Sequence, residues 1–384
     1  MAWLRNKSPT TTLSAPPSLF LLLLTGTLAI IAGVVLFVLH SSGAVKVLSA
    51  MNVWTVSLAP PAVWFLLLCI WGWFRGQEID EHQFLEKEAR YAQAQWEEWA
   101  ERHLAVLGSS VLLPNDVTAD TLWKSGEGSF PSQSMRVCRL PTTSLADAVL
   151  SCLGGIQESL QALPRNLPLR VTLVSDVAQD ALSAAFIPAW GTLFPERALP
   201  ADLTMTQAHS FSWVEARLEQ PVLTVNLVIV VQLNGGEAYS DTMAALLLTS
   251  DDVAQKYRLS YPARLLRPMS LDLTAVEKDL TLFLETQTVA CRTARILADA
   301  LCWHTVSASL SSVGGIHGAD WKSADTMMLE KLCGIPGASA PWILTALGAE
   351  IVMSGNLSLL TLLSSGTEQF VSTIAPGSEN ANIG

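Results

Sequence analysis

The chain has 384 residues, of which 50% are hydrophobic and only 15% are charged, and its formal net charge is -11. This acidic balance argues against a nucleic-acid partner, because phosphate binding requires a dense Lys/Arg surface. The six cysteines show no CxxC pair or regular spacing, so the sequence indicates neither a zinc site nor a disulfide framework.

Two uncharged apolar runs, residues 18–39 and 51–74, follow an N-terminal stretch of residues 1–17. Each run is long enough to cross a hydrocarbon core of about 30 Å, at about 1.5 Å per helical residue. The first run is also too long for the apolar core of a cleaved signal peptide. We therefore expect two transmembrane helices embedded in a lipid bilayer.

The orientation of these helices follows from the basic residues near their ends. Arg5, Lys7 and Arg75 flank the pair on one side, and Lys46 stands alone in the loop between them. Positive charge is retained on the cytoplasmic side during insertion. We therefore expect residues 1–17 and everything after the second span to be cytoplasmic, although a margin of two basic residues leaves the inverted orientation open.

Residues 77–107 are rich in Glu, Ala, Gln and Arg, with apolar residues recurring at helical spacing. This pattern predicts a helix that leaves the membrane. Its aromatic residues Tyr91, Trp96 and Trp99 are a candidate partner surface. The alternative is that this stripe packs onto the domain that follows, since the apolar positions keep no strict heptad register.

Residues 108–375 read as one α/β domain, followed by a flexible tail at 376–384. The pattern predicts a helix at 145–163, a strand at 169–175 and a helix at 177–189, an alternation typical of α/β folds. Residues 222–233 form the strongest strand pattern in the chain, apolar on both faces. With residues 244–249 they predict an antiparallel pair at the edge of the sheet.

The remaining pattern is weaker. It predicts a helix from Ala275, a strand at 303–310, a short helix at 323–332 and a final strand at 371–374. The apolar stretch 345–364 contains Glu350, and a carboxylate is costly at bilayer depth. We therefore expect a buried helix there, not a third span.

Two segments resemble the thiolase-like fold of β-ketoacyl synthases. Leu223–Asp252 reads LTVNLVIVVQLNGGEAYSDTMAALLLTSDD, similar to that family's core strand, its Ser/Gly-rich turn and its alanine-rich strand. Trp342–Ser365 is similar to the family's glycine-punctuated buried helix. The resemblance covers about residues 145–374 and implies a layered α/β/α fold.

The family's catalytic residues do not match this sequence. The place of the nucleophilic cysteine, at the start of the helix before the core strand, is taken by residues 206–209, which include His209 but no cysteine. The HGTGT histidine motif has only a faint counterpart in residues 317–320, which lack both threonines. The second histidine is replaced near Glu350. Condensation requires a thiolate and neighbouring histidines, so the resemblance implies a non-catalytic relative.

A second resemblance concerns the whole layout. Two N-terminal spans, the helix QWEEWAERHLAVL and a cytoplasmic domain look like uncharacterised inner-membrane proteins found with bacterial type VI secretion machinery. The matching segment is Trp96–Pro114. This resemblance implies a multi-pass protein of the bacterial inner membrane.

Other candidate chemistry is weak. His209 and Glu215 are more simply a chance pairing among scattered histidines, and residues 314–318 are a glycine-rich loop without the Lys-Ser/Thr of a phosphate cradle. No GxSxG, HExxH, P-loop or GxGxxG motif occurs. The sequence therefore predicts no cofactor, no metal and no catalytic residue.

The leading hypothesis is an inner-membrane accessory protein whose non-catalytic cytoplasmic domain binds membrane or cytoplasmic proteins. The alternative is a membrane-bound enzyme for acyl or lipid substrates that uses Cys291, Cys302 or His317 in an unfamiliar arrangement. A third reading is a sensor of a cytoplasmic ligand. Homo-oligomer formation is left open.

Overall fold

The computed structural model describes residues 3–5, 7, 9, 11–43, 52–141, 144–322 and 326–378. The chain forms two compact units. One joins Met1–Arg5 to Trp96–Gly384 and is called the sheet unit; the other comprises Asn6–Gln95 and is called the hairpin unit. Each is described by itself.

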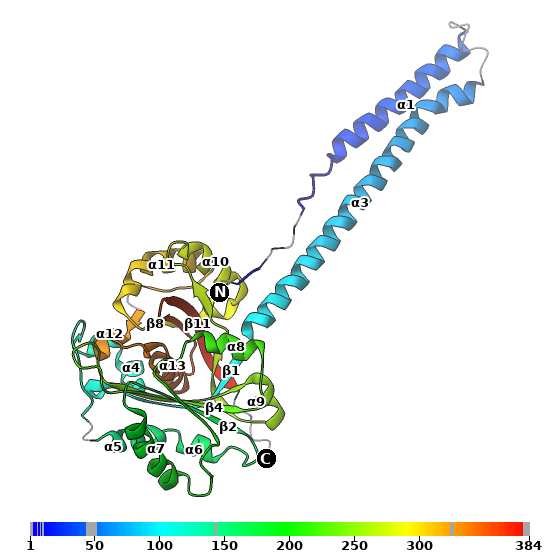
Figure 1. Ribbon diagram of the computed structural model, residues 1–384. Coiled ribbons are helices and arrows are strands. Elements are labelled where there is room, and N and C mark those ends of the chain that lie inside the picture. Colours follow the sequence, from blue (N-terminus) through cyan, green and yellow to red (C-terminus); the bar gives the residue numbers. More distant parts are fainter. Residues whose placement is uncertain are drawn as a thin grey trace. The chain divides into compact units, whose positions relative to one another are not determined.

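The hairpin unit contains helix α1 (Leu19–Ser41) and most of helix α3 (Val53–Glu101), drawn in Figure 1. Both helices are long and apolar enough to cross a membrane, with mean hydropathy of 2.7 and 1.9 in their most apolar stretches. The two predicted spans are thus confirmed as candidate membrane helices. Lys46 and the loop around it lie outside the described residues.

The two helices approach closely at Gly33, the buried glycine of α1. A Cβ atom at this position would lie 2.5 Å from the backbone oxygen of Ser57. Pro61, four residues after Ser57, has no N–H to donate to that oxygen. One turn further along α3, Trp64 Nε1 donates to Thr25 Oγ1 at 3.1 Å. Small residues that let helix backbones approach are typical of membrane helix pairs.

Helix α3 is continuous from Val53 to Glu101, where the sequence predicted a span and a separate helix ending at Leu107. The predicted end is wrong, because residues 103–112 form strand β1 (His103–Leu112). Its side chains alternate between two cores: Leu104 and Val106 enter one, Ala105 and Leu107 the other. A short run that is apolar on both faces fits a helix and a buried strand equally well by pattern.

The described residues of the sheet unit form one sheet with eleven strands. They are β1, β2 (Leu169–Ser175), β3 (Asp202–Thr206), β4 (Val225–Gln232), β5 (Thr242–Ser250), β6 (Tyr261–Leu266), β7 (Met269–Leu271), β8 (Arg295–Ala298), β9 (Thr326–Met328), β10 (Leu359–Ser365) and β11 (Glu368–Ser378). The order across the sheet is β3-β2-β4-β5-β1-β6-β11-β10-β8-β9, and β7 pairs with β11.

This order contains the same arrangement twice. From the junction between β1 and β6 outwards, one half runs β1-β5-β4-β2-β3 and the other β6-β11-β10-β8-β9. Within each half, numbered along the chain, both read 1-5-4-2-3. In both halves the second strand is parallel to the third and fourth, and the fourth is antiparallel to the fifth. The unit is therefore built from two similar halves.

The described α-helices of the sheet unit, besides the end of α3, cover and separate these halves. They are α4 (Ala119–Ser125), α5 (Leu145–Gly154), α6 (Gln157–Gln161), α7 (Gln179–Leu193), α8 (Ser212–Glu219), α9 (Asp251–Tyr257), α10 (Val276–Thr286), α11 (Ser307–Ile316), α12 (Leu329–Cys333) and α13 (Ala340–Gly355).

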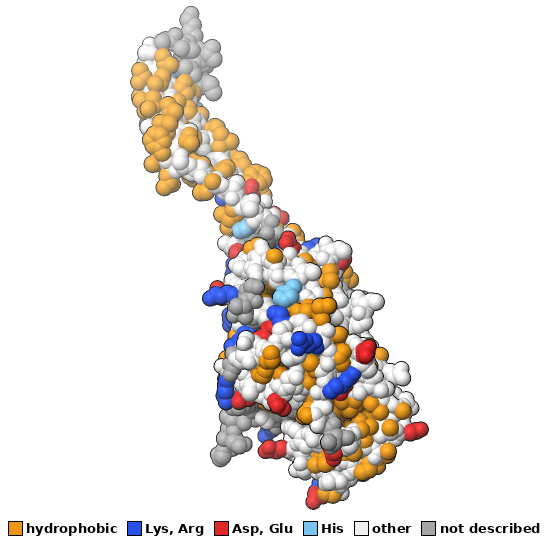
Figure 2. Space-filling view, turned by 90° about the vertical axis from the view of Figure 1, so that its left-hand side faces the viewer, with side chains coloured by type: hydrophobic (Ala, Val, Ile, Leu, Met, Phe, Trp, Pro, Cys, Tyr) orange, Lys and Arg blue, Asp and Glu red, His pale blue; other side chains and the backbone are white. Residues whose placement is uncertain are grey.

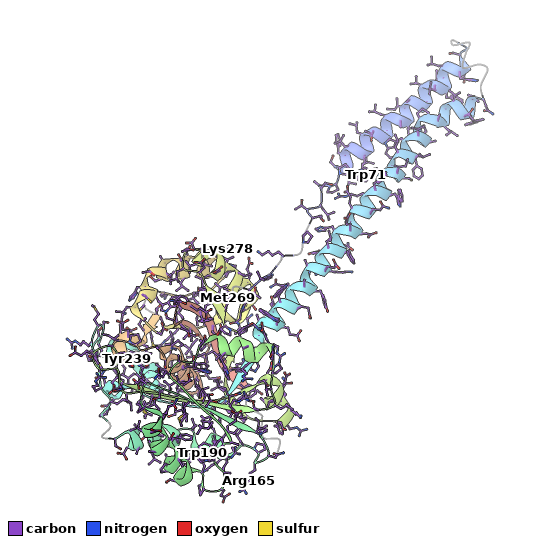
Figure 3. All side chains as sticks on the ribbon, viewed as in Figure 1. Trp71, Arg165, Trp190, Tyr239, Met269 and Lys278 are labelled. Carbon is purple, nitrogen blue, oxygen red and sulfur yellow. The ribbon has the colours of Figure 1, made fainter. Side chains whose placement is uncertain are left out.

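Three hydrophobic cores show that these elements form five layers (Figure 1). The first core lies between α5–α7 and the first half-sheet and contains Trp190, labelled in Figure 3. The central core lies between the two half-sheets and holds α8 and α13. The third, with Met269 of Figure 3, lies between the second half-sheet and α10–α11. Odd-numbered residues of β4 enter the first core, and Val228 and Val230 enter the central one.

Local sequence accounts for the ends of several elements. All eight residues of β4 are buried, as expected for a strand apolar on both faces. Ser144 caps α5 by accepting from the Asp147 N–H. Helix α13 has a proline in its first turn and ends at Asn356 in the left-handed conformation, with φ 47°. Of the buried helix expected at residues 345–364, the first part is confirmed in α13, whose residues 340–352 are buried except Glu350. The second part is wrong, because residues 359–364 belong to strand β10.

Several predictions of detail are wrong. The antiparallel pair β4–β5 exists, but it lies inside the sheet, because β1 pairs with the free side of β5. Residues 303–310 are helical, and the strand of this region is β8 just before them. The predicted helix 145–163 divides into α5 and α6 at Gly154–Ile156.

The late boundaries also shift. Residues 326–328 of the predicted helix 323–332 belong to strand β9, and 323–325 lie outside the described residues. The final strand β11 extends to Ser378, so residues 376–378 of the predicted tail belong to a strand. Residues 379–384 lie outside the described residues. The sheet unit includes residues 96–107, which precede the predicted boundary at 108, as well as Met1–Arg5.

Candidate functional site

The N-terminal ends of α8 and α13 meet in the central core. Each helix lies between the third and fourth strands of its own half. The residues that meet are His209 and Phe211, just before α8, Trp213 in its first turn, and Trp342 in the first turn of α13. We call these four residues the aromatic junction. Residues 206–209, where the resemblance places the nucleophile, lead into it.

The aromatic junction is closely packed. The His209 imidazole stacks on the Trp342 indole, with ring centroids 4.9 Å apart and planes 23° apart. Trp213 and Phe211 lie 5.8 and 5.3 Å from the same indole. Trp342 Nε1 donates to the His209 carbonyl oxygen at 2.7 Å. Ring stacking and this hydrogen bond together fix the backbone at the position before α8.

The electrostatics of His209 favour its neutral form. Burial, with a smaller contribution from the Arg217 guanidinium, lowers the pKa of His209 to about 4. Its Nε2 atom is buried and has no hydrogen-bond partner among the described residues. A general base works best when its pKa lies near the operating pH. At neutral pH this imidazole is therefore an uncharged packing group.

The other residues weighed from the sequence lie apart from one another. Glu215 does not pair with His209; its carboxylate accepts from Arg267 Nη1. Cys302 lies in the 3-10 helix that precedes α11 (Leu301–Val306), and His317 directly follows α11, whose ten residues span about 15 Å. The described structure therefore does not bring these two groups together.

Four cysteine thiols have raised pKa values, which favour their protonated form. Burial raises the pKa of Cys152 to about 12 and raises the pKa of Cys291 and Cys333. The pKa of Cys302 is also raised, by burial and then by the nearby Asp299 carboxylate. Nucleophilic cysteines have lowered pKa values, because the thiolate is the attacking species. These four thiols have the opposite property.

A pocket of about 380 Å³ opens at the carboxyl ends of β2, β3 and β4. Its polar lining comes from Ser175, Asp176, Gln179, Thr206, Gln207 and Asn234. The carboxyl ends of strands at a change of strand order are where open α/β sheets bind ligands. We call this the carboxyl-edge pocket. The sequence patterns did not predict it, although Asp176 directly follows the predicted strand at 169–175.

Asp176 ties the end of β2 to the end of β4. Its carboxylate accepts from the N–H groups of Leu233 (3.1 Å) and Asn234 (2.8 Å) and from the Tyr239 hydroxyl (3.0 Å). Tyr239 is labelled in Figure 3. The carboxylate is thus engaged by three donors at the rim of the carboxyl-edge pocket.

The second half contains the same device. Asp299 directly follows β8, as Asp176 follows β2, and its carboxylate accepts from the N–H of Ser364 at the end of β10. Here the carboxylate is only 1% exposed, and Trp303 Nε1 donates to it at 2.8 Å. The two carboxylates therefore differ in their surroundings. Asp299 is buried against Trp303, whereas Asp176 in the other half is partly exposed.

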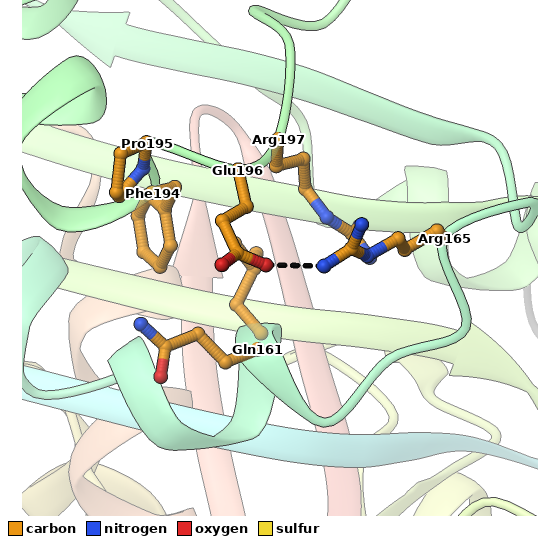
Figure 4. Close-up of a pocket in the computed structure, with 7 residues that line it drawn as sticks. Gln161, Arg165, Phe194, Pro195, Glu196 and Arg197 are labelled. Carbon is orange, nitrogen blue, oxygen red and sulfur yellow. Dashed lines mark hydrogen bonds and ion pairs between the residues drawn. The ribbon is translucent and has the colours of Figure 1, made fainter.

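A further pocket of about 320 Å³ is lined by residues of α6 and of the segments that follow α6 and α7 (Figure 4). Arg165 and Glu196 form an ion pair across its mouth, and Arg197 donates to the Leu163 carbonyl oxygen at 3.0 Å. Surface ion pairs of this kind contribute little energy. The residues that line this pocket are separate from those of the aromatic junction.

The predicted partner surface is divided by the structure. Tyr91 lies in the hairpin unit and is 69% exposed, whereas Trp96 and Trp99 belong to the sheet unit. Trp99 packs edge-on to Trp96 at 5.3 Å and beneath the Arg267 guanidinium, 4.0 Å from its ring centroid. The alternative reading, in which the tryptophan stripe packs onto the domain that follows, therefore holds for Trp99.

Comparisons with known proteins find a likeness of fold. No protein-family model and no curated protein matches the chain. Among solved structures it is similar to AntDE:AntF, a type II PKS acyl-carrier protein in complex with its ketosynthase (10% identity, 72% of this chain and 99% of that one, TM-score 0.49). It is also similar to 3-oxoacyl-[acyl-carrier-protein] synthase III from Aquifex aeolicus (11%, 71% and 99%, 0.45) and to OleA from Xanthomonas campestris bound with cerulenin (10%, 73% and 98%, 0.46).

These identities concern the fold alone, and the activities named belong to those proteins. The layered α/β class predicted from the sequence for the part after the two apolar helices is confirmed by the two stacked halves of the sheet. The structure has five layers where the prediction named three, because the second half adds its own sheet and outer helices.

Proposed function

We propose that this chain is an accessory protein anchored in a bacterial inner membrane, whose non-catalytic thiolase-like unit faces the cytoplasm and binds other proteins. The layout resemblance favours type VI secretion as its setting. The observation that carries the proposal is the close packing of the aromatic junction, which includes His209, one of the residues where the resemblance to β-ketoacyl synthases would put the nucleophile.

The packing of Trp342 supports a non-catalytic role. An acyl substrate needs an open approach to the reacting atom and donors aimed at the developing oxyanion. At the aromatic junction the indole of Trp342 stacks on His209, and its N–H is already used by the His209 carbonyl oxygen. Binding an acyl group there would require the loss of these contacts.

The runner-up is an enzyme for acyl or lipid substrates that uses Cys291, Cys302 or His317. The raised pKa values of both thiols disfavour it. Incubating the detergent-solubilised protein with a thiol-reactive acyl probe separates the two proposals. We expect no selective labelling of either thiol, whereas labelling that disappears in Cys302→Ala would favour the enzyme.

Partner binding is tested by reciprocal purification. The full-length protein, tagged and cross-linked in its own membranes, should recover one protein reproducibly, and that protein, tagged in turn, should recover this chain. Recovery in only one direction, or of no protein partner, would argue against the accessory role. A variant at an exposed surface-pocket residue, Arg165→Ala, is the matched control and should not change recovery.

A further inference from the structure

Residues Trp3–Arg5 precede both membrane helices in the sequence but belong to the sheet unit. Figure 1 shows the N-terminal end of the chain beside α10. The chain therefore leaves the sheet unit at Arg5, passes through α1 and α3, and returns to it at Trp96.

Trp3 is a core residue of the sheet unit. Its side chain is only 6% exposed and lies in the third core, between the Trp99 ring (5.2 Å, planes at 80°) and the Phe283 ring of α10 (5.5 Å). Edge-on aromatic contacts at such distances add to the burial of a large apolar surface. The site that receives Trp3 thus joins the end of α3 to α10.

Arg5 completes the attachment at the C-terminal end of α10. Its guanidinium donates to the Glu285 carbonyl oxygen at 3.1 Å and to Thr286 Oγ1 at 2.9 Å. The last carbonyl groups of a helix lack intrahelical donors and carry partial negative charge, so a cation there is favourable. Arg5 therefore binds the C-terminal end of α10 through its charge, and Trp3 packs on the Phe283 ring of the same helix.

The intervening residue points away. Leu4 is 91% exposed, while Trp3 is buried and Arg5 half-buried, which is the alternation of an extended segment. Docking thus uses every second side chain, an aromatic group followed by a cation.

We propose that residues 3–5 are an intramolecular ligand of the sheet unit, a latch that holds the N-terminal segment against α10 and α3 of the same chain. Docking itself is independent of the accessory role proposed above. Docking requires the segment before α1 and the unit after α3 to lie on the same membrane face, a condition that is met when α1 and α3 both cross the membrane.

The test replaces Trp3 with the photoreactive aromatic p-benzoyl-phenylalanine in the full-length protein and irradiates intact membrane vesicles before any detergent is added. Mass spectrometry should find cross-links from position 3 to residues 96–101 and 276–286 of the same chain. The matched control carries the same amino acid at Leu4, whose exposed position should give few of these cross-links.

A second variant tests the role of charge without disturbing the core. Arg5→Glu places a carboxylate against the α10 carbonyl groups and should weaken docking roughly tenfold, with a corresponding fall in cross-link yield. Arg5→Lys, which keeps the cation, should retain most of the yield.

Three outcomes would overturn the proposal. The first is a yield from position 3 no higher than that from position 4. The second is a cross-linked species with the mass of two chains, which would mean that the segment docks on a second copy. The third is an equal yield for Arg5→Glu and Arg5→Lys, which would remove the charge-dependent contact. An enzyme activity found in this chain would affect the proposed function and leave these results unchanged.

Discussion

Glu350 gives the sharpest prediction, because its carboxyl group is largely buried in α13 at the centre of the sheet unit. Burial raises the pKa of Glu350 from 4.5 to about 7, and a hydrogen bond with the Val111 backbone partly offsets this rise. Each pH unit between the two pKa values corresponds to about 1.4 kcal/mol. Ionising Glu350 in the folded protein therefore costs about 3 kcal/mol.

The sign of this effect is opposite to that of a carboxylate in an ion pair. The folded state holds the proton more tightly than the unfolded state, so the contribution of Glu350 to stability falls as pH rises from 4.5 to about 7. Glu350→Gln removes the titration and keeps an oxygen that can accept from Val111. The variant should match the parent near pH 4.5 and exceed it by about 3 kcal/mol at pH 8.

The assay is thermal unfolding of the full-length protein in detergent, followed by tryptophan fluorescence between pH 5 and pH 8. A gain of about 3 kcal/mol should raise Tm by roughly 5 °C at the alkaline end. Glu368→Gln, which makes the same change at the exposed first residue of β11, is the control for a substitution outside the core. An equal gain at pH 5 and pH 8 for Glu350→Gln would refute the burial argument.

Three further predictions concern packing and reactivity. Arg267→Ala should lower the free energy of unfolding by about 3–5 kcal/mol by leaving the half-buried Glu215 unpaired, whereas the exposed pair broken in Arg165→Ala should cost at most about 1 kcal/mol in the same urea titration. Gly33→Leu should lengthen the distance between spin labels on α1 and α3, since a Cβ would meet a carbonyl oxygen of α3 at 2.5 Å; an unchanged distance would contradict the close approach. Cys302 should be alkylated more slowly at pH 7 than free cysteine, because its thiol pKa is raised. Mass spectrometry can monitor the alkylation, and a rate equal to or above that of free cysteine would contradict the prediction.

Much of the fold could be predicted where a local pattern had one reading. The strand at 169–175 has the bounds expected, and residues 222–233 contain β4 because an uninterrupted β-branched run between turn residues suits a central strand. The charge of Glu350 correctly excluded a third span. In each case the deciding property lay within the segment itself.

The misses share a different cause. The place of β4 and β5 inside the sheet depends on β1, which pairs with β5 from more than a hundred residues away. The resemblance puts the family's reactive position just before α8, and the packing of that place depends on Trp342, 133 residues further along the chain. The docking of Trp3 depends on Phe283. No local periodicity carries information about such partners.

The duplicated aspartates give this chain an internal reference. Asp176 and Asp299 hold matching backbone positions in the two halves. Asp176 lines an open pocket, whereas the carboxylate of Asp299 accepts from the Trp303 indole. The chain therefore contains two versions of the same corner, and any experiment exposes both to the same conditions. If a small molecule binds at the open corner beside Asp176, the closed corner beside Asp299 is the internal control, because Trp303 contacts the carboxylate there.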